Sequence, residues 1–450
     1  MFAKEVYQER RNKLKSEIGE GIILLPGNGE SGINFRDNTY HFRQDSCFLY
    51  FTGISRPDLC LVIDIDNDQE ILFGDELTVD DIVWTGALET IEAQAEKTGI
   101  AFTRKKTEVI NALAGNRKVH FLPVYRAETS LKLMDWGLTG EASVPLIKAI
   151  VAQRSIKSAQ EIQEIEKAIA ISTLMQLKAQ EIARPGVTEN AVAAQLQAVA
   201  IANGGQLAFP SILTVNGEIL HNHASNTVLK DGQMVLCDCG AENELFYAGD
   251  LTRTFPVGKT FTPLQQDVYH IVLNAQLKAI EALQPGVLYK DVHLLASEHL
   301  VRGLTDLGLM KGDPKQAVAE GAHTLFFQCG LGHMMGLDVH DMENLGEEYI
   351  GYTAELKKSK EFGLKSLRLG KALEPGFVVT VEPGLYFIPV LIDSWAAENK
   401  HAQFINYEKV KQFRDFGGIR IEDDFLITAT GNRLLGPPLI KTVEDLHANR

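Results

Sequence analysis

Residues 235–255 read VLCDCGAENELFYAGDLTRTF, and this stretch decides the fold. Asp238 follows an apolar run, and Asp250 lies inside a second strand-like run. The polar segment 240–244 between them is rich in turn-forming residues. The pattern predicts two antiparallel strands, each with one carboxylate at its middle or end. Because an isolated buried carboxylate is costly, this pair needs protons, cations or metal ions between its members.

The sequence around Asp238 recurs later in the chain. Residues 229–240 read LKDGQMVLCDCG and residues 373–384 read LEPGFVVTVEPG, so that Asp238 stands opposite Glu382 in one register. The helix junctions also pair, since Pro-Gly-Val occurs at both 185–187 and 285–287. Two matches in the same order predict an α+β domain with a pseudo-twofold duplication. The offset grows from 100 residues at the junctions to 144 at the strands, which places an insertion of 44 residues mostly within 341–369. Long insertions beside a site often act as lids or specificity elements.

The chain is predicted to form a smaller α/β domain over residues 1–155 and a catalytic domain over residues 156–450. In the second domain, Ser158 with Glu161 and Thr262 with Gln265 mark helix starts, and further helices are predicted up to residue 203 and over 292–304. The first domain lacks a catalytic cluster of its own. Its strands are predicted at 21–25, 47–52, 59–65, 70–73 and 119–122, and its helices at 80–97 and 108–114.

Length and composition set the broad class of protein. At 450 residues two domains are expected, and 45% hydrophobic with 23% charged residues is typical of a soluble globular protein. The net charge of −15 argues against nucleic acid or an anionic membrane as the main partner. No stretch resembles a signal peptide or a membrane span of ~20 apolar residues. Five scattered cysteines favour a reducing cytoplasm over a disulfide framework or a four-thiolate zinc site.

Acidic residues in both halves point to a metal centre. Asp238, Asp250, Glu382 and Glu422 lie in or beside predicted strands, and residues 330–341 (GLGHMMGLDVHD) add His333 and His340 in an apolar, glycine-rich setting. Singly, each acid is better explained as a turn or surface residue, and each histidine as a core residue. Acids in equivalent places of both halves outweigh those explanations. Carboxylates with an imidazole suit Mn, Co, Fe or Zn, and two such ions would offset the negative charge and activate a shared water.

These residues match a known family. The chain resembles the pita-bread metallopeptidases that cleave Xaa-Pro bonds, namely prolidase (Xaa-Pro dipeptidase) and aminopeptidase P. The resemblance covers nearly the whole chain. It is carried by the motifs YHFRQDSCFLYFTG, HNH, DCG, AGDLTRTFP, GLGHMMGLDVHD, VEPGLYF and GGIRIEDD.

The resemblance implies a site and its cofactor. It assigns two divalent ions, usually Mn²⁺, to five ligands: Asp238, Asp250, His333, Glu382 and Glu422. Glu382 is implied as the acid/base, and the resemblance places His221, His340 and Arg420 at the substrate. It further implies short proline-containing peptides as substrates and a homodimer, with residues 40–46 as a loop that reaches a neighbouring subunit's site.

The choice between dipeptidase and aminopeptidase depends on Arg368. A dipeptide presents its carboxylate directly after proline, and Arg368 in GLKSLRLGK resembles the prolidase arginine that holds this group. We therefore favour a dipeptidase, and the alternative is an aminopeptidase that acts on longer peptides. The plain alternative for Arg368 itself is a solvated charge on a helix. A metal-free creatinase-type enzyme and a non-catalytic binding protein on the same fold are disfavoured because all five ligand positions are intact. The chain departs from the family pattern in two places: the spacing from Asp238 to Asp250 is one residue longer, and Cys329 replaces a histidine.

Overall fold

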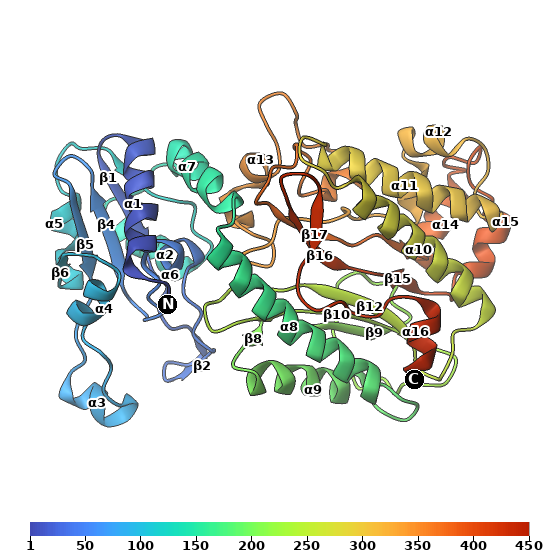
Figure 1. The fold of residues 1–450 in the computed structure, drawn as a ribbon, viewed down its shortest axis with the longest axis horizontal. Coiled ribbons are helices and arrows are strands. Elements are labelled where there is room, and N and C mark those ends of the chain that lie inside the picture. Colours follow the sequence, from blue (N-terminus) through green and yellow to red (C-terminus); the bar gives the residue numbers. More distant parts are fainter. Residues whose placement is uncertain (450) are drawn as a thin grey trace. The chain divides into compact units, whose positions relative to one another are not determined.

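The computed structural model describes residues 1–449, which form two compact units. The first unit consists of Met1–Arg154 with Met342–Tyr349, and the second of Ser155–Asp341 with Ile350–Arg450 (Figure 1). The segment Met342–Tyr349 therefore belongs with the first unit, although it lies within the insertion of the second half.

The first unit is built on a five-stranded sheet of order β6-β5-β4-β1-β7, in which β1 runs antiparallel to β4 and parallel to β7. A separate hairpin pairs β2 with β3. The strands are β1 Ile22–Pro26, β2 Gly32–Phe35, β3 Asn38–Thr39, β4 Cys60–Asp64, β5 Gln69–Phe73, β6 Phe102–Arg104 and β7 Val119–His120. The helices are α1 Lys4–Ile18, α2 Ser46–Thr52, α3 Val79–Thr85, α4 Ile91–Lys97, α5 Val109–Leu113, α6 Ala127–Asp135 and α7 Val144–Ser155, with α13 Glu347–Ile350 from the insertion.

Two predictions for the first unit are wrong. Residues 47–52 are helix α2 rather than a strand, since Asp45 caps its start and Gly53, at φ 67°, ends it. All seven residues of α2 are buried, so its sequence is apolar on every face, and a buried strand looks the same. Residues 80–97 form two helices rather than one, because Gly86 ends α3 at φ 80° and Thr90 caps α4.

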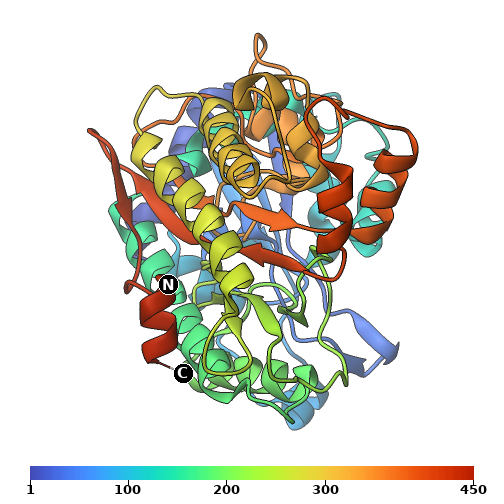
Figure 2. The same cartoon turned by 90° about the vertical axis from the view of Figure 1, so that its right-hand side faces the viewer.

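The second unit contains two three-stranded sheets, of order β12-β10-β9 and β13-β16-β17, and the pair β14-β15. Helices α8 and α9 lie side by side, as do α10 and α11, with α8 packed on β10 and β12, and α10 on β13 to β15 (Figures 1 and 2). The strands are β8 Gln206–Leu207, β9 Ile212–Val215, β10 Met234–Cys239, β11 Ala241–Glu242, β12 Leu251–Pro256, β13 Val378–Val381, β14 Gly384–Tyr386, β15 Gly418–Arg420, β16 Asp423–Ile427 and β17 Asn432–Leu434. The helices are α8 Ala159–Ile182, α9 Glu189–Ala202, α10 Pro263–Ala282, α11 Tyr289–Asp306, α12 Pro314–Ala319, α14 Pro389–Ala397, α15 Tyr407–Val410 and α16 Val443–Ala448.

The predicted duplication is confirmed by matching backbone hydrogen bonds. In the first half the Gly186 amide donates to the Leu229 carbonyl at 2.9 Å, and in the second half the Gly286 amide donates to Leu373 at 2.8 Å. These bonds join each Pro-Gly helix junction to the segment before β10 in the first half and before β13 in the second half. Each half therefore closes its helix pair onto its sheet in the same way.

Two glutamines extend the correspondence beyond the sequence match. Gln176 on α8 donates to carbonyls of β10 and β12 at 3.0 and 2.6 Å. Gln276 on α10 donates to the carbonyls of Val381 and Ile421, both at 3.3 Å. Both glutamines are fully buried, so each ties the two site-bearing strands of its half to the helix behind them.

The described part of the chain, residues 1–449, contains no helix with the length and apolar character that crossing a bilayer requires.

Candidate metal centre

The hairpin predicted from residues 235–255 is present and carries both aspartates. Asp238 lies in β10 opposite Thr252, and Asp250 directly precedes β12. Both are buried, with 8% and 5% of their surface exposed. The strands approach so closely beyond Asp238 that a Cβ atom at Gly240 would overlap the Gly249 carbonyl. Glycine is therefore required at this position for the two aspartates to lie on adjacent strands.

The turn between the strands closes locally. The Asn243 side-chain oxygen accepts hydrogen bonds from the amides of Leu245 and Tyr247 at 3.0 and 3.1 Å. Phe246 takes the left-handed conformation, with φ 67°, that a tight turn requires. The spacing between Asp238 and Asp250 is thus compatible with regular pairing of β10 and β12.

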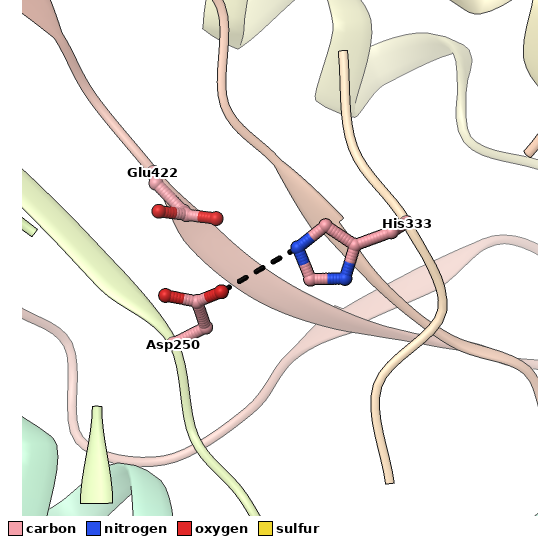
Figure 3. Close-up of side chains that lie close together, drawn as sticks. All are labelled: Asp250, His333 and Glu422. Atoms are coloured by element: carbon pink, nitrogen blue, oxygen red, sulfur yellow. Dashed lines mark ion pairs between the residues drawn. The ribbon is translucent and has the colours of Figure 1, made fainter. Parts of the chain in front are cut away.

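Asp250, His333 and Glu422 point toward one another from three segments far apart in the sequence (Figure 3). One ligand atom from each lies within 4.8 Å of the others, and all three residues are buried. The His333 Nε2 atom lies 3.4 Å from an Asp250 oxygen and 3.6 Å from a Glu382 oxygen. The backbone holds His333 in place, since its amide donates to the Thr380 hydroxyl and its carbonyl accepts from the Thr380 amide. These distances suit a divalent cation between the side chains.

Arg420 organises the other side of the cluster. Its guanidinium donates to Asp238 at 2.6 Å and to the Tyr386 hydroxyl at 2.7 Å. It also donates to the Thr252 hydroxyl, which in turn donates to Glu422 at 2.6 Å. Side chains alternate around Glu422, since Ile419 and Ile421 join the core while Arg420 and Glu422 line the cavity. Arg420 therefore orients Asp238 of the first half directly and Glu422 of the second half through Thr252.

Without a bound metal ion, burial disfavours the ionised form of three acids in the cluster, Asp250, Glu382 and Glu422. Burial, together with Asp238, raises the pKa of Asp250 well above its usual range, and burial, together with Asp250, does the same for Glu422. Burial raises the pKa of Glu382 to about 8, although Arg420 opposes the shift. One oxygen each of Asp238 and Asp250 is buried without a hydrogen-bond partner. Orphaned carboxylate oxygens beside an imidazole fit divalent metal ions, whose charge would stabilise the ionised acids.

A cavity of about 320 Å³ opens onto this cluster. All nine predicted site residues line it: His221, Asp238, Asp250, His333, His340, Arg368, Glu382, Arg420 and Glu422. The His340 ring lies 4.3 Å from the His333 ring, nearly edge to face. Burial and the charge of Arg420 lower the pKa of His221, so its imidazole is neutral at neutral pH. The cavity thus combines hydrogen-bonding imidazoles with the acidic cluster.

Sequence reasoning missed several residues of the site. The cavity has an apolar wall formed by Phe209, Pro210, Ile212, Leu220 and Val339. Thr252 and Tyr386, which orient Glu422 and Arg420, were also missed. Both occur in the quoted motifs DLTRTF and VEPGLYF, so they could have been found by asking which polar groups flank each acid on its strand.

Comparisons with known proteins identify the family of this chain. The sequence profile of metallopeptidase family M24 matches residues 163–429, and that of the aminopeptidase P N-terminal domain matches residues 7–120. The chain belongs to metallopeptidase family M24. This M24 chain is 31% identical to the Xaa-Pro aminopeptidase of Escherichia coli (strain K12), covering 99% of this chain and 98% of that one. It is 30% identical to the Xaa-Pro dipeptidase of Homo sapiens, covering 98% and 90%.

Solved structures agree on the fold. A zinc-substituted E. coli aminopeptidase P in complex with product superposes with a TM-score of 0.80 at 29% identity, covering 100% of this chain and 98% of that one. The M24 protein therefore has the predicted pita-bread fold and is a metallopeptidase with a centre for divalent metal ions.

Proposed function

We propose that this M24 metallopeptidase hydrolyses the bond between a first residue and proline, using two divalent metal ions, for which we propose Mn²⁺. The observation that carries the proposal is the convergence of four acids, three of them buried, and of His333 in one cavity together with His221, His340 and two arginines. Relatives that span nearly the whole chain are an Xaa-Pro aminopeptidase and an Xaa-Pro dipeptidase, which supports this substrate class.

Asp238, Asp250, His333, Glu382 and Glu422 would hold the ions. When bound, two such ions supply Lewis acidity and a water of lowered pKa. Titration with Mn²⁺, Co²⁺, Zn²⁺ and Fe²⁺ after chelation would show which ion gives activity. Asp250→Asn is expected to lose activity with every metal, and full activity in that variant would overturn the two-metal proposal. If the protein binds proline-containing peptides but cleaves none of them with any metal, the alternative of a non-catalytic binding protein replaces this proposal.

Glu382 is suited to carry the proton that the reaction needs. The nitrogen of an Xaa-Pro bond has no hydrogen, so the proline nitrogen must gain a proton as it leaves. Glu382 lines the cavity with one oxygen 3.6 Å from the His333 Nε2 atom, so it can accept a proton from the attacking water and pass it to the proline nitrogen. His221, neutral and on the cavity wall, can donate a hydrogen bond to the developing oxyanion.

Arg368 favours dipeptides as substrates. Its side chain lines the cavity from the insertion, whereas Lys365, three residues earlier, is exposed. A dipeptide carries its carboxylate where a longer peptide has an amide, so a cation at this wall stabilises only the dipeptide. A clamp of this kind distinguishes a dipeptidase from an aminopeptidase.

Paired assays test this preference. Arg368→Met is expected to raise KM for an Xaa-Pro dipeptide about tenfold or more and to leave an Xaa-Pro-Xaa tripeptide unaffected. Lys365→Met is the matched control, which removes a nearby positive charge outside the cavity. If the wild type prefers the tripeptide and Arg368→Met behaves like the wild type, the aminopeptidase alternative replaces the dipeptidase proposal.

We further propose that residues 1–155 serve as a domain for self-association, giving a homodimer, and that residues 156–450 are the catalytic domain. Helix α3 has no buried residue, and Trp84 on it is 87% exposed. Phe35 and Tyr40, on and beside the β2–β3 hairpin, are 63% and 59% exposed. Gln44 is instead buried, and its side-chain oxygen accepts hydrogen bonds from the amides of Asn28 and Asp45. Gln44 therefore shapes the 40–46 loop, whereas the exposed Tyr40 is available for contact with a second subunit. We also propose a cytoplasmic location, which the odd number and scattered positions of the five cysteines favour.

A further inference from the structure

The loop that carries His333 and His340 is fastened at its start by strand β13. The His333 backbone exchanges hydrogen bonds with Thr380, and the Met335 amide donates to the Val378 carbonyl at 3.0 Å. His333 therefore has support from the sheet itself. His340 lies seven residues further on, beyond the part of the loop that pairs with β13.

The end of the loop is fastened by a buried ion pair. The Lys157 ammonium donates to an Asp341 oxygen at 2.8 Å, and each side chain is only 1% exposed. Asp341 directly follows His340, and its amide donates to the Met334 carbonyl, which closes the loop on itself. The pair packs on Gly336, where a Cβ atom would lie 2.7 Å from the Asp341 carboxylate and 3.0 Å from the Lys157 side chain.

Lys157 is itself held on a rigid part of the second unit. Its amide donates to the Gly376 carbonyl at 2.9 Å, and Ser158 beside it caps α8 through a capping box. Both members of the pair lie at the edge of the second unit. That unit begins at Ser155, and the chain leaves it for the first unit directly after Asp341. The pair therefore fixes the histidine loop at the point where the chain departs.

A buried ion pair adds little net stability compared with apolar side chains of the same size, because both charges lose their hydration. Its directional hydrogen bond can nevertheless specify one conformation. We propose that the Lys157–Asp341 pair is a positioning device that holds His340 against His333 at the wall of the cavity. The inference rests on the proposed function, in which His340 contacts the substrate.

The experiment compares Lys157→Met, Asp341→Asn and the double variant, which keeps the shape of the pair but removes both charges. Each single variant removes one charge of a buried pair and leaves the other charge without that partner, so both are expected to lower the thermal midpoint, and the double variant to regain most of that loss. Because His340 is then no longer fixed, kcat/KM of the double variant for an Xaa-Pro dipeptide should remain about tenfold to a hundredfold below wild type. The dissociation constant for Mn²⁺ should stay within about twofold of wild type, since Thr380 still supports His333. Lys167→Met, which breaks an exposed pair with Glu164 on α8, is the control and should change none of these values.

Two results would overturn the inference. Recovery of kcat/KM together with the thermal midpoint in the double variant would make the pair purely structural. A parallel loss of Mn²⁺ affinity would mean that the pair supports the whole metal centre rather than His340.

Hydrogen exchange gives a readout that does not depend on activity. In the double variant the amides of residues 335–341 should exchange about tenfold faster or more, while those of β13 keep their wild-type rates. Unchanged exchange in the loop would contradict the inference. If the wild type fails to cleave Xaa-Pro substrates, the proposed function is wrong, and this exchange measurement still tests the ion pair.

Discussion

Loading the metal-free protein with Mn²⁺ near neutral pH is expected to release protons. Glu382 has a pKa of about 8 in the absence of metal, so at pH 7 its protonated form exceeds its ionised form about tenfold. A metal ligand must be ionised, so binding displaces this proton. Glu382 alone then releases about 0.9 proton at pH 7 and about 0.1 at pH 9. Asp250 and Glu422, whose pKa values burial also raises, add to that number.

Titration calorimetry measures this release directly. The observed heat of Mn²⁺ binding is compared in two buffers with different ionisation enthalpies, first at pH 7 and then at pH 9. The slope against ionisation enthalpy gives the number of protons released, which should be at least about 0.9 at pH 7 and clearly smaller at pH 9. Glu382→Gln, which has no proton to lose, should lower the value at pH 7 by about 0.9. A slope of zero at pH 7 would refute the view that the acids are protonated without metal.

The same pKa predicts how stability depends on pH. A carboxyl group whose pKa rises from 4.5 to about 8 on folding binds its proton more tightly in the folded protein than in the unfolded one. Its contribution to stability is fully present below pH 4.5 and is lost as pH rises toward 8, by an amount on the order of a few kcal/mol. The thermal midpoint of the metal-free protein should therefore fall, relative to the loaded protein, between about pH 5 and pH 8. A gap between the two forms that is independent of pH would contradict this.

Three further perturbations test other parts of the molecule. Arg253 is fully buried and paired with Asp423 at 2.6 Å, so Arg253→Met leaves that acid without this partner and should lower the free energy of unfolding in urea by about 3–5 kcal/mol; a loss below about 1 kcal/mol would contradict the pair's importance. Burial raises the pKa of Cys329 to about 12, so iodoacetamide at pH 7.5 should leave this thiol unmodified in the folded protein, as mass spectrometry would show, and rapid labelling would contradict it. Trp84→Ala should leave the thermal midpoint unchanged but weaken self-association in sedimentation velocity, and an unaltered dimer would exclude Trp84 from the interface.

Local signals made much of this fold predictable. Ser158 and Thr262 form the capping boxes that their sequences predict, and the alternation around Glu422 places apolar side chains in the core and polar ones in the cavity. The duplication was visible because equivalent strands need the same glycine and apolar positions. These features depend on neighbours within a few residues, and a single sequence records them.

Long-range pairing set the limit of prediction. Lys157 and Asp341 are 184 residues apart, and Arg420 and Asp238 are 182 apart, so no local pattern connects them. Helix α2 failed for a different reason. A segment that is buried on every side carries no periodicity, and only Asp45 before it and Gly53 after it marked a helix.

The frame around the acidic cluster explains how so many buried carboxylates are tolerated. Gln176 and Gln276 bind the strands behind the site through neutral side chains, and Thr252 does the same for Glu422. Neutral donors hold the geometry without partial neutralisation of the acids, whereas a lysine at either glutamine position would compete with a metal ion for their charge. Among residues 1–449, Arg420 is the cation within hydrogen-bond distance of Asp238, and it is linked to Glu422 through the Thr252 hydroxyl. Arg420 therefore offsets little of the negative charge of the cluster, and the raised pKa values of Asp250, Glu382 and Glu422 are the consequence in this M24 metallopeptidase when no metal ion is bound.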